Sequence, residues 1–126
     1  MTMMKPLAFV CSDNMVLGTQ LVDRLEELGY RVEIIADAHQ LSAQTRSSRP
    51  FVIVSDLVSR GTDLVPAIKG LRQDKETAHI PIIGMTTNPN RQFHANAVAA
   101  GASVVSMESG ILAQLPQLLD MALAVD

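Results

Sequence analysis

The six residues FVIVSD, at positions 51–56, decide the fold of this 126-residue chain. The first four are apolar, three of these are β-branched, and Pro50 and Gly61 bound the run. A short, continuous apolar run predicts a buried central strand rather than an alternating edge strand. Asp56 then stands at the C-terminal end of the strand, the edge at which open α/β sheets bind ligands. Taken alone, Asp56 could equally cap the next helix.

Similar apolar segments recur along the chain and alternate with helical patterns. Four further runs predict strands, at residues 7–11, 30–36, 81–86 and 103–106. Helices are predicted at about residues 15–28, 38–46, 63–73 and 88–100, with a last one after residue 110 that has Pro116 near its start. Capping residues are expected among residues 12–14, at Asp37, and at Thr62 or Asp63. Residues 57–62 predict a loop.

Five strands that alternate with five helices predict a parallel sheet with right-handed crossovers and helices on both faces. The expected architecture is α/β, a three-layer sandwich with a flavodoxin-like (βα)5 doubly wound parallel sheet. Its natural strand order is 2-1-3-4-5, although pattern alone does not fix the order. Residues 1–126 are expected to form a single domain with no output domain.

Composition excludes several classes of protein. A formal net charge of −3 and the absence of tryptophan give no footprint for nucleic acid or an anionic membrane. No apolar stretch approaches the roughly 20 residues that span a bilayer. One cysteine, Cys11, suits a reducing compartment, and its place in the first strand predicts a small buried hydrophobe. We expect a cytoplasmic protein.

The predicted strand order brings several oxygen-bearing groups to one edge of the sheet. Asp13 follows the first strand, Asp56 ends the third, and Thr86 ends the fourth. Two carboxylates and a backbone carbonyl just after Asp56, for which Val58 is the candidate, suit Mg²⁺. The Thr86 hydroxyl could hydrogen-bond a phosphoryl oxygen. Asp13 could instead cap the first helix, or do both.

The sequence resembles the receiver domain of two-component response regulators over nearly its whole length. Asp13 matches the metal-binding acid of that family, Asp56 its phosphoacceptor, and Thr86 the hydroxyl residue that closes onto the phosphoryl group. Gly101-Ala102 resembles the step that often precedes the fifth strand. The resemblance implies Mg²⁺ as cofactor, a sensor histidine kinase or phosphotransfer protein as phosphodonor, and a downstream protein partner. A homodimer stays open.

The sequence also departs from that family. Ser12 stands where a second acid is usual, and the loop after Asp56 lacks the usual Met-Pro pair. The fifth-strand lysine is missing, and Ser106, Met107 or Glu108 takes its place. Val104 or Val105 replaces the aromatic switch residue.

Two functions follow from these matches and departures. The first is a phosphorylatable switch, an atypical receiver that is no enzyme, with Asp56 as acceptor. The second is a pseudo-receiver, whose fold serves as a phosphorylation-independent interaction module. A small α/β enzyme is disfavoured, because no base–nucleophile pair is evident.

Overall fold

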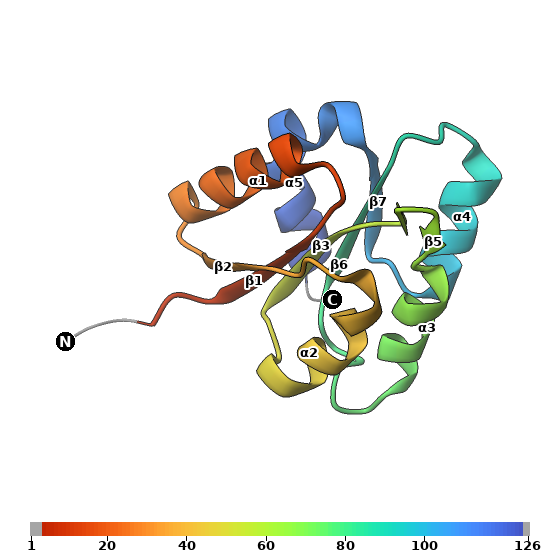
Figure 1. The fold of residues 1–126 in the computed structure, drawn as a ribbon, viewed down its shortest axis with the longest axis horizontal. Coiled ribbons are helices and arrows are strands. Elements are labelled where there is room, and N and C mark those ends of the chain that lie inside the picture. The colour runs from red at the N-terminus through yellow and green to blue at the C-terminus, as the bar shows by residue number, and fades with distance from the viewer. Residues whose placement is uncertain (1–3, 125–126) are drawn as a thin grey trace.

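The computed structural model describes residues 4–124 and builds them around one parallel sheet (Figure 1). The sheet contains β1 (Leu7–Cys11), β2 (Arg31–Ile34), β3 (Val52–Asp56), β6 (Ile82–Thr86) and β7 (Val104–Met107). Their spatial order is β2-β1-β3-β6-β7. Counted along the chain, these five strands have the predicted order 2-1-3-4-5, and every pairing between them is parallel. The fold prediction is therefore confirmed.

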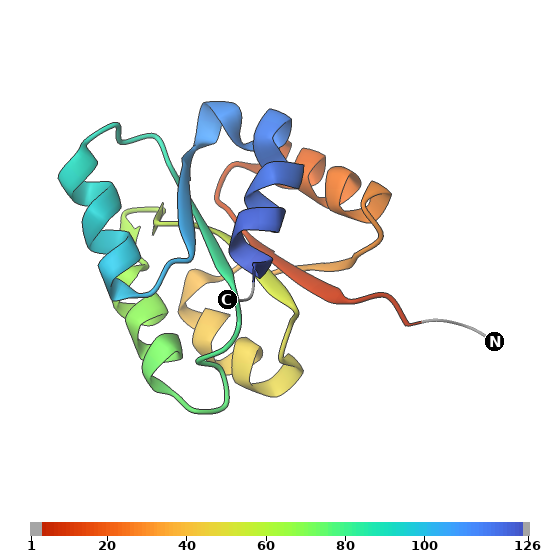
Figure 2. The same ribbon diagram turned by 180° about the vertical axis from the view of Figure 1, so that it is seen from behind.

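Helices cover both faces of the sheet, as Figures 1 and 2 show from opposite sides. One face carries α1 (Met15–Glu27) and α5 (Ile111–Leu123), and the other carries α2 (Leu41–Ser48), α3 (Val65–Gln73) and α4 (Arg91–Ala100). Short 3₁₀ turns, η1 (Ala38–Gln40) and η2 (Glu108–Gly110), lead into α2 and α5. The molecule is thus the predicted three-layer sandwich.

Two apolar clusters, one on each face, form the core. Strand residues with even numbers in β1 and β3, such as Val10 and Val54, pack with Leu21 and Leu115 of α1 and α5. Their odd-numbered neighbours, including Phe9 and Ile53, pack on the other face with residues of α2, α3 and α4. All five residues of β3 are buried. Burial on both faces explains why residues 52–54 are continuously apolar rather than alternating.

Two helix starts follow the capping residues that the sequence offers. Asn14 is the N-cap of α1, where its side chain accepts a hydrogen bond from Leu17 N–H at 3.0 Å. Asp37 caps η1 by accepting from His39 N–H. Gly29 follows α1 with φ of 100°, a left-handed conformation that glycine adopts without strain.

The prediction of a plain loop at residues 57–62 is wrong. The segment forms a β-hairpin of two short antiparallel strands, β4 (Val58–Ser59) and β5 (Thr62–Asp63). Its two turn residues, Arg60 and Gly61, have φ of 50° and 77°. Positive φ at both positions is the pattern of a type I′ hairpin, which is normally announced by Asn-Gly or Gly-Gly. Arginine in the first position hides that signal.

Three helix starts also differ from prediction. Asn88 does not begin α4, because it accepts from Asn90 N–H in a turn and Asn90 is the cap. The N-cap of α3 is Leu64, although Asp63 accepts from Val65 N–H. Pro116 lies inside α5 rather than near its start, since η2 leads directly into a helix that begins at Ile111.

A close contact joins β3 to β6 just beyond Asp56. Leu57 donates its N–H to Met85 O at 2.9 Å, and its side chain packs over Gly84. A Cβ atom at Gly84 would come within 2.7 Å of Leu57 Cδ2. The absence of a side chain at Gly84 therefore lets Leu57 pack directly on β6.

Candidate functional site

The strands end level with one another at the edge of the sheet where the predicted site residues lie. In register, Cys11 pairs with Ser55, Asp56 with Met85, and Thr86 with Met107. Asp13 comes two residues after β1, and Thr86 comes one residue after the partner of Asp56. The structure therefore gathers Asp13, Asp56 and Thr86 from three adjacent strands, as the sequence predicts.

Asp13 and Asp56 are joined directly. Asp13 N–H donates to Asp56 Oδ2 at 2.9 Å, across 43 positions of sequence. The carboxylate of Asp13 in turn accepts at Oδ2 from Arg60 N–H, at 2.7 Å. Asp13 therefore does not cap α1, because that role belongs to Asn14. Of the two roles that the sequence left open for Asp13, capping of α1 is wrong, and metal binding stays a prediction.

Asp56 is buried where an ionised carboxylate is costly. Only 4% of its surface is exposed. Burial raises the pKa of Asp56 to about 6, the hydrogen bond from Asp13 N–H opposes that rise, and the charges of Asp13 and Glu108 add to it. At neutral pH most molecules still carry the carboxylate. Asp56 thus carries an ionised carboxylate in a largely desolvated position.

Thr86 lies on the strand next to Asp56 and is 8% exposed. Its hydroxyl oxygen accepts a hydrogen bond from Asn88 N–H at 3.0 Å. In the described part of the chain this hydroxyl makes no hydrogen bond to Asp56. Its proton therefore stays available as a donor toward an oxygen placed above the end of β3.

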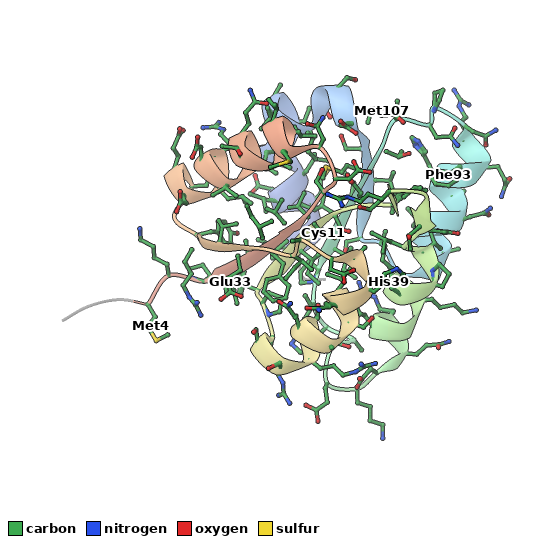
Figure 3. The ribbon with its side chains drawn as sticks, in the orientation of Figure 1. Met4, Cys11, Glu33, His39, Phe93 and Met107 are labelled. Carbon is green, nitrogen blue, oxygen red and sulfur yellow. The ribbon has the colours of Figure 1, made fainter. Side chains whose placement is uncertain are left out.

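Of the three residues that the sequence left open at the end of the fifth strand, Glu108 is the one whose charge acts on Asp56. Strand β7 ends at Met107, which Figure 3 labels, and Glu108 is the next residue. Asn14 Nδ2 donates to Glu108 Oε1 at 2.9 Å and so ties the β7 end to the loop after β1. Ser106 instead is buried and donates to Met107 O. A carboxylate, rather than a cation, therefore stands at the rim of the site.

The residues present fit Mg²⁺ by the chemistry of their donor set. Asp13 and Asp56 supply two neighbouring carboxylates, and Mg²⁺ usually takes one or two of these and keeps several waters. Val58 lies two residues after Asp56, in the hairpin opposite Asp63, and its carbonyl stays a predicted ligand. Over residues 4–124 no group of three or more His, Cys, Asp or Glu side chains is arranged for a metal. A cage made of protein side chains alone is therefore not what this site offers.

Sequence reasoning missed two residues of the site. Asn14 was assigned only to helix capping, yet it also holds Glu108. Arg60 was assigned to a featureless loop, yet its N–H binds Asp13. Asn14 binds two partners through separate atoms, Oδ1 and Nδ2, of which the sequence predicted only one. The contact of Arg60 uses its backbone N–H, so the residue type could not predict it.

Other candidate groups lie outside this site. Cys11 is 1% exposed, and burial raises the pKa of its thiol to about 11, so it is the expected buried hydrophobe. A hollow of about 580 Å³ is lined by Lys5, Arg31 and Phe51 at the opposite edge of the sheet. Asp13, Asp56 and Thr86 do not line it. Within residues 4–124 no helix could span a membrane.

Comparison with known proteins bears on the fold. The sequence matches no protein-family model and no curated protein significantly. The structure is similar to chemotaxis protein CheY4 of Vibrio cholerae, with TM-score 0.84, 22% identity and coverage of 94% of this chain and 99% of that one. A LuxR-family two-component response regulator from Aurantimonas gives TM-score 0.80 at 24% identity, over 92% of this chain and 83% of that one.

A third similar structure carries a metal. It is the receiver domain of a sensor histidine kinase from Pseudomonas aeruginosa, described with a magnesium ion coordinated in its active-site cleft. It gives TM-score 0.82 at 25% identity and covers 94% of this chain and 97% of that one. The resemblance predicted from sequence is thus confirmed for the fold, which is that of receiver domains.

Proposed function

We propose that this receiver-type domain accepts a phosphoryl group on Asp56. The observation that supports this most is the direct link between Asp56 and Asp13, by which residues from two separate strands form one acidic pair at the C-terminal edge of a receiver fold. Asp56 ends the central strand, and its carboxylate is ionised at neutral pH despite burial. Phosphoryl transfer depends mainly on positioning and charge, and this carboxylate is fixed in position.

Each site residue has a part in this proposal. Asp13, Asp56 and the carbonyl of Val58 would hold Mg²⁺, which when bound offsets negative charge on the phosphoryl oxygens. Thr86 would donate its hydroxyl proton to one of those oxygens. Asn88 N–H orients that hydroxyl by occupying its acceptor side.

The proposed partners follow from a receiver role. A sensor histidine kinase or a phosphotransfer protein would supply the phosphoryl group, and a downstream protein would read the modified state. The domain would act as a signalling module rather than as an enzyme, and the cytoplasm is its proposed compartment.

A second candidate function is a pseudo-receiver that binds a protein partner without phosphorylation. Glu108 favours it, because a carboxylate at the rim repels a phosphorylated Asp56 where the receiver family has an attracting lysine. The fold would then be kept as an interaction surface.

Mass spectrometry separates the two candidates. The protein is incubated with acetyl phosphate and Mg²⁺, and we expect wild type to gain one phosphoryl group while Asp56→Asn gains none. Asp23→Asn, which changes an exposed carboxylate on α1, serves as a matched control and should be modified like wild type. An unmodified wild type would overturn the first candidate and favour the second.

A further inference from the structure

The site surrounds its acceptor with negative charge. The two charges that act most strongly on Asp56 are those of Asp13 and Glu108, and both raise its pKa. A phosphoryl group on Asp56 brings nearly two further negative charges at neutral pH. A cation from the protein would offset this charge together with Mg²⁺, and β7 contains no Lys or Arg that could do so.

Most arginines of the described chain are already engaged elsewhere. Arg24, Arg46 and Arg49 form ion pairs with carboxylates, and Arg72 donates to the carbonyls of Gly101 and Ala78. Within residues 4–124, the loops at the Asp56 edge bring only two Lys or Arg residues there. These are Arg60, at the hairpin tip, and Arg91, the first residue of α4.

Arg60 and Arg91 differ in their relation to the acceptor. The backbone of Arg60 is fixed to the acidic pair, because its N–H lies 2.7 Å from Asp13 Oδ2. In the described residues Arg91 has no such contact with Asp13 or Asp56. Arg60 is exposed and forms no ion pair within the described chain, so its guanidinium is available for a ligand.

The conformation of Arg60 argues in the same direction. Its φ of 50° lies in the left-handed region, where a side chain with a Cβ is disfavoured and Asn or Gly is the usual choice for this turn. Residues held in such conformations are concentrated at functional sites. The turn itself gains nothing from arginine, which points to a use for the side chain.

We infer that Arg60 is the cation that binds the phosphoryl group on Asp56, in place of the lysine missing from β7. This inference rests on the proposed function. In the present structure Arg60 lines a hollow beside Asp37 and His39, the latter labelled in Figure 3. In this role the exposed side chain would turn from that hollow toward Asp56, while its backbone N–H stays bound to Asp13. Its planar donors match phosphoryl oxygens in a paired geometry that lysine lacks.

The reaction that Arg60 would assist is balanced without a proton. With acetyl phosphate as donor, an oxygen of the ionised Asp56 carboxylate forms a bond to phosphorus. The bond from phosphorus to the acetyl oxygen breaks, and acetate leaves with the electron pair. The guanidinium would stabilise the negative charge on the phosphoryl oxygens as the group is transferred to a site that already holds carboxylates.

The test compares initial rates of phosphoryl uptake from acetyl phosphate, in excess Mg²⁺, by intact-mass measurement. Arg60→Gly removes the guanidinium and also suits the left-handed turn, so the hairpin should be retained. We expect its uptake to be slower by about tenfold, the value of one charge-assisted hydrogen bond. Arg60→Lys should recover part of the rate, because charge is kept and the fork is lost. Arg91→Ala should behave like wild type.

The outcomes separate the inference from the function on which it rests. A wild type that takes up no phosphoryl group overturns both. A wild type that is modified at the same rate as Arg60→Gly overturns the role of Arg60 and leaves Asp56 as acceptor. A loss in Arg91→Ala instead of Arg60→Gly assigns the cation to α4 and also overturns the inference. Equal rates in Arg60→Lys and Arg60→Gly would show that the charge at position 60 does not affect the rate, and would also overturn the inference.

Discussion

The two sides of the candidate site differ in the polar and charged groups that they bring together. The loops after β1 and β3, here called the acceptor side, bring together Asp13 and Asp56 through a 2.9 Å hydrogen bond. The ends of β6 and β7, here called the response side, offer the Thr86 hydroxyl but also the Glu108 carboxylate. In the proposed function, accepting a phosphoryl group and responding to it would therefore be separable, since they would depend on different strands.

The largest effect should come from the acceptor side. Asp13→Asn keeps the backbone N–H that binds Asp56 and an oxygen that can accept from Arg60 N–H, but removes a carboxylate from the proposed Mg²⁺ site. We expect phosphoryl uptake from acetyl phosphate to fall by roughly 100-fold, because losing even outer partners of a metal site costs about 10- to 100-fold. Initial rates by intact mass measure it.

Mg²⁺ titration followed by amide NMR sharpens the same prediction. Amides near positions 13 and 56 should shift in wild type at millimolar Mg²⁺ and should stay unchanged in Asp13→Asn. Asp23→Asn provides the control for a change of net charge. Wild-type amides that ignore Mg²⁺ would remove the metal from the acceptor side.

The next effect concerns stability, and its sign follows from the pKa of Asp56. The folded value of about 6 lies above the ordinary 3.8, so ionisation of Asp56 opposes folding. That cost is fully present above pH 6 and disappears as pH falls through 6 toward 4. Without Mg²⁺, Asp56→Asn should stabilise the fold at pH 7.5 by about 2 to 3 kcal/mol, at about 1.4 kcal/mol for each pKa unit.

Urea unfolding at several pH values checks this expectation. The gain in free energy of unfolding for Asp56→Asn over wild type should shrink steadily between pH 6 and pH 4. A gain that is the same at pH 7.5 and pH 4 would mean that the substitution acts through packing and not through charge.

The smallest effect belongs to the response side. Glu108→Gln replaces the carboxylate by an amide, whose oxygen can still accept the hydrogen bond from Asn14. It removes a charge that raises the pKa of Asp56. We expect the pKa of Asp56 to fall by about half a unit, the scale of one unit charge acting through a partly solvated gap. A carbon-13 carboxyl titration measures it, with Glu26→Gln on α1 as the control. An unchanged pKa would place Glu108 outside the electrostatics of the site.

Much of the fold was predictable because its signals are local and strong. Continuous apolar character at residues 51–54 and 7–11 predicts buried strands, and leucine spacing together with Asn14 predicts α1. The convergence of Asp13, Asp56 and Thr86 then follows from strand order alone. The hairpin at residues 58–63 escaped prediction because its turn uses arginine where a left-handed residue is needed.

The site was only partly predictable, because several of its contacts use backbone atoms. Asp13 binds the Asp56 carboxylate through its N–H, and Arg60 binds the Asp13 carboxylate in the same way, so the side-chain type of each donor residue plays no part in the contact. The register of β7 against β6 could not be derived from the sequence, so Ser106, Met107 and Glu108 were all open as replacements of the fifth-strand lysine. Registers between distant strands set these contacts, and one residue of slip changes them.

Gly84 has a consequence for how strain would spread from the acceptor. Leu57 directly follows Asp56 and is clamped to β6 by its N–H bond to Met85 and by its packing over Gly84. Leu57 therefore couples the end of β3 directly to β6, the strand that carries Thr86. Mechanical linkage of this sort needs no group from β7. A methyl group at position 84 would clash with the Leu57 side chain and disturb the packing between β3 and β6.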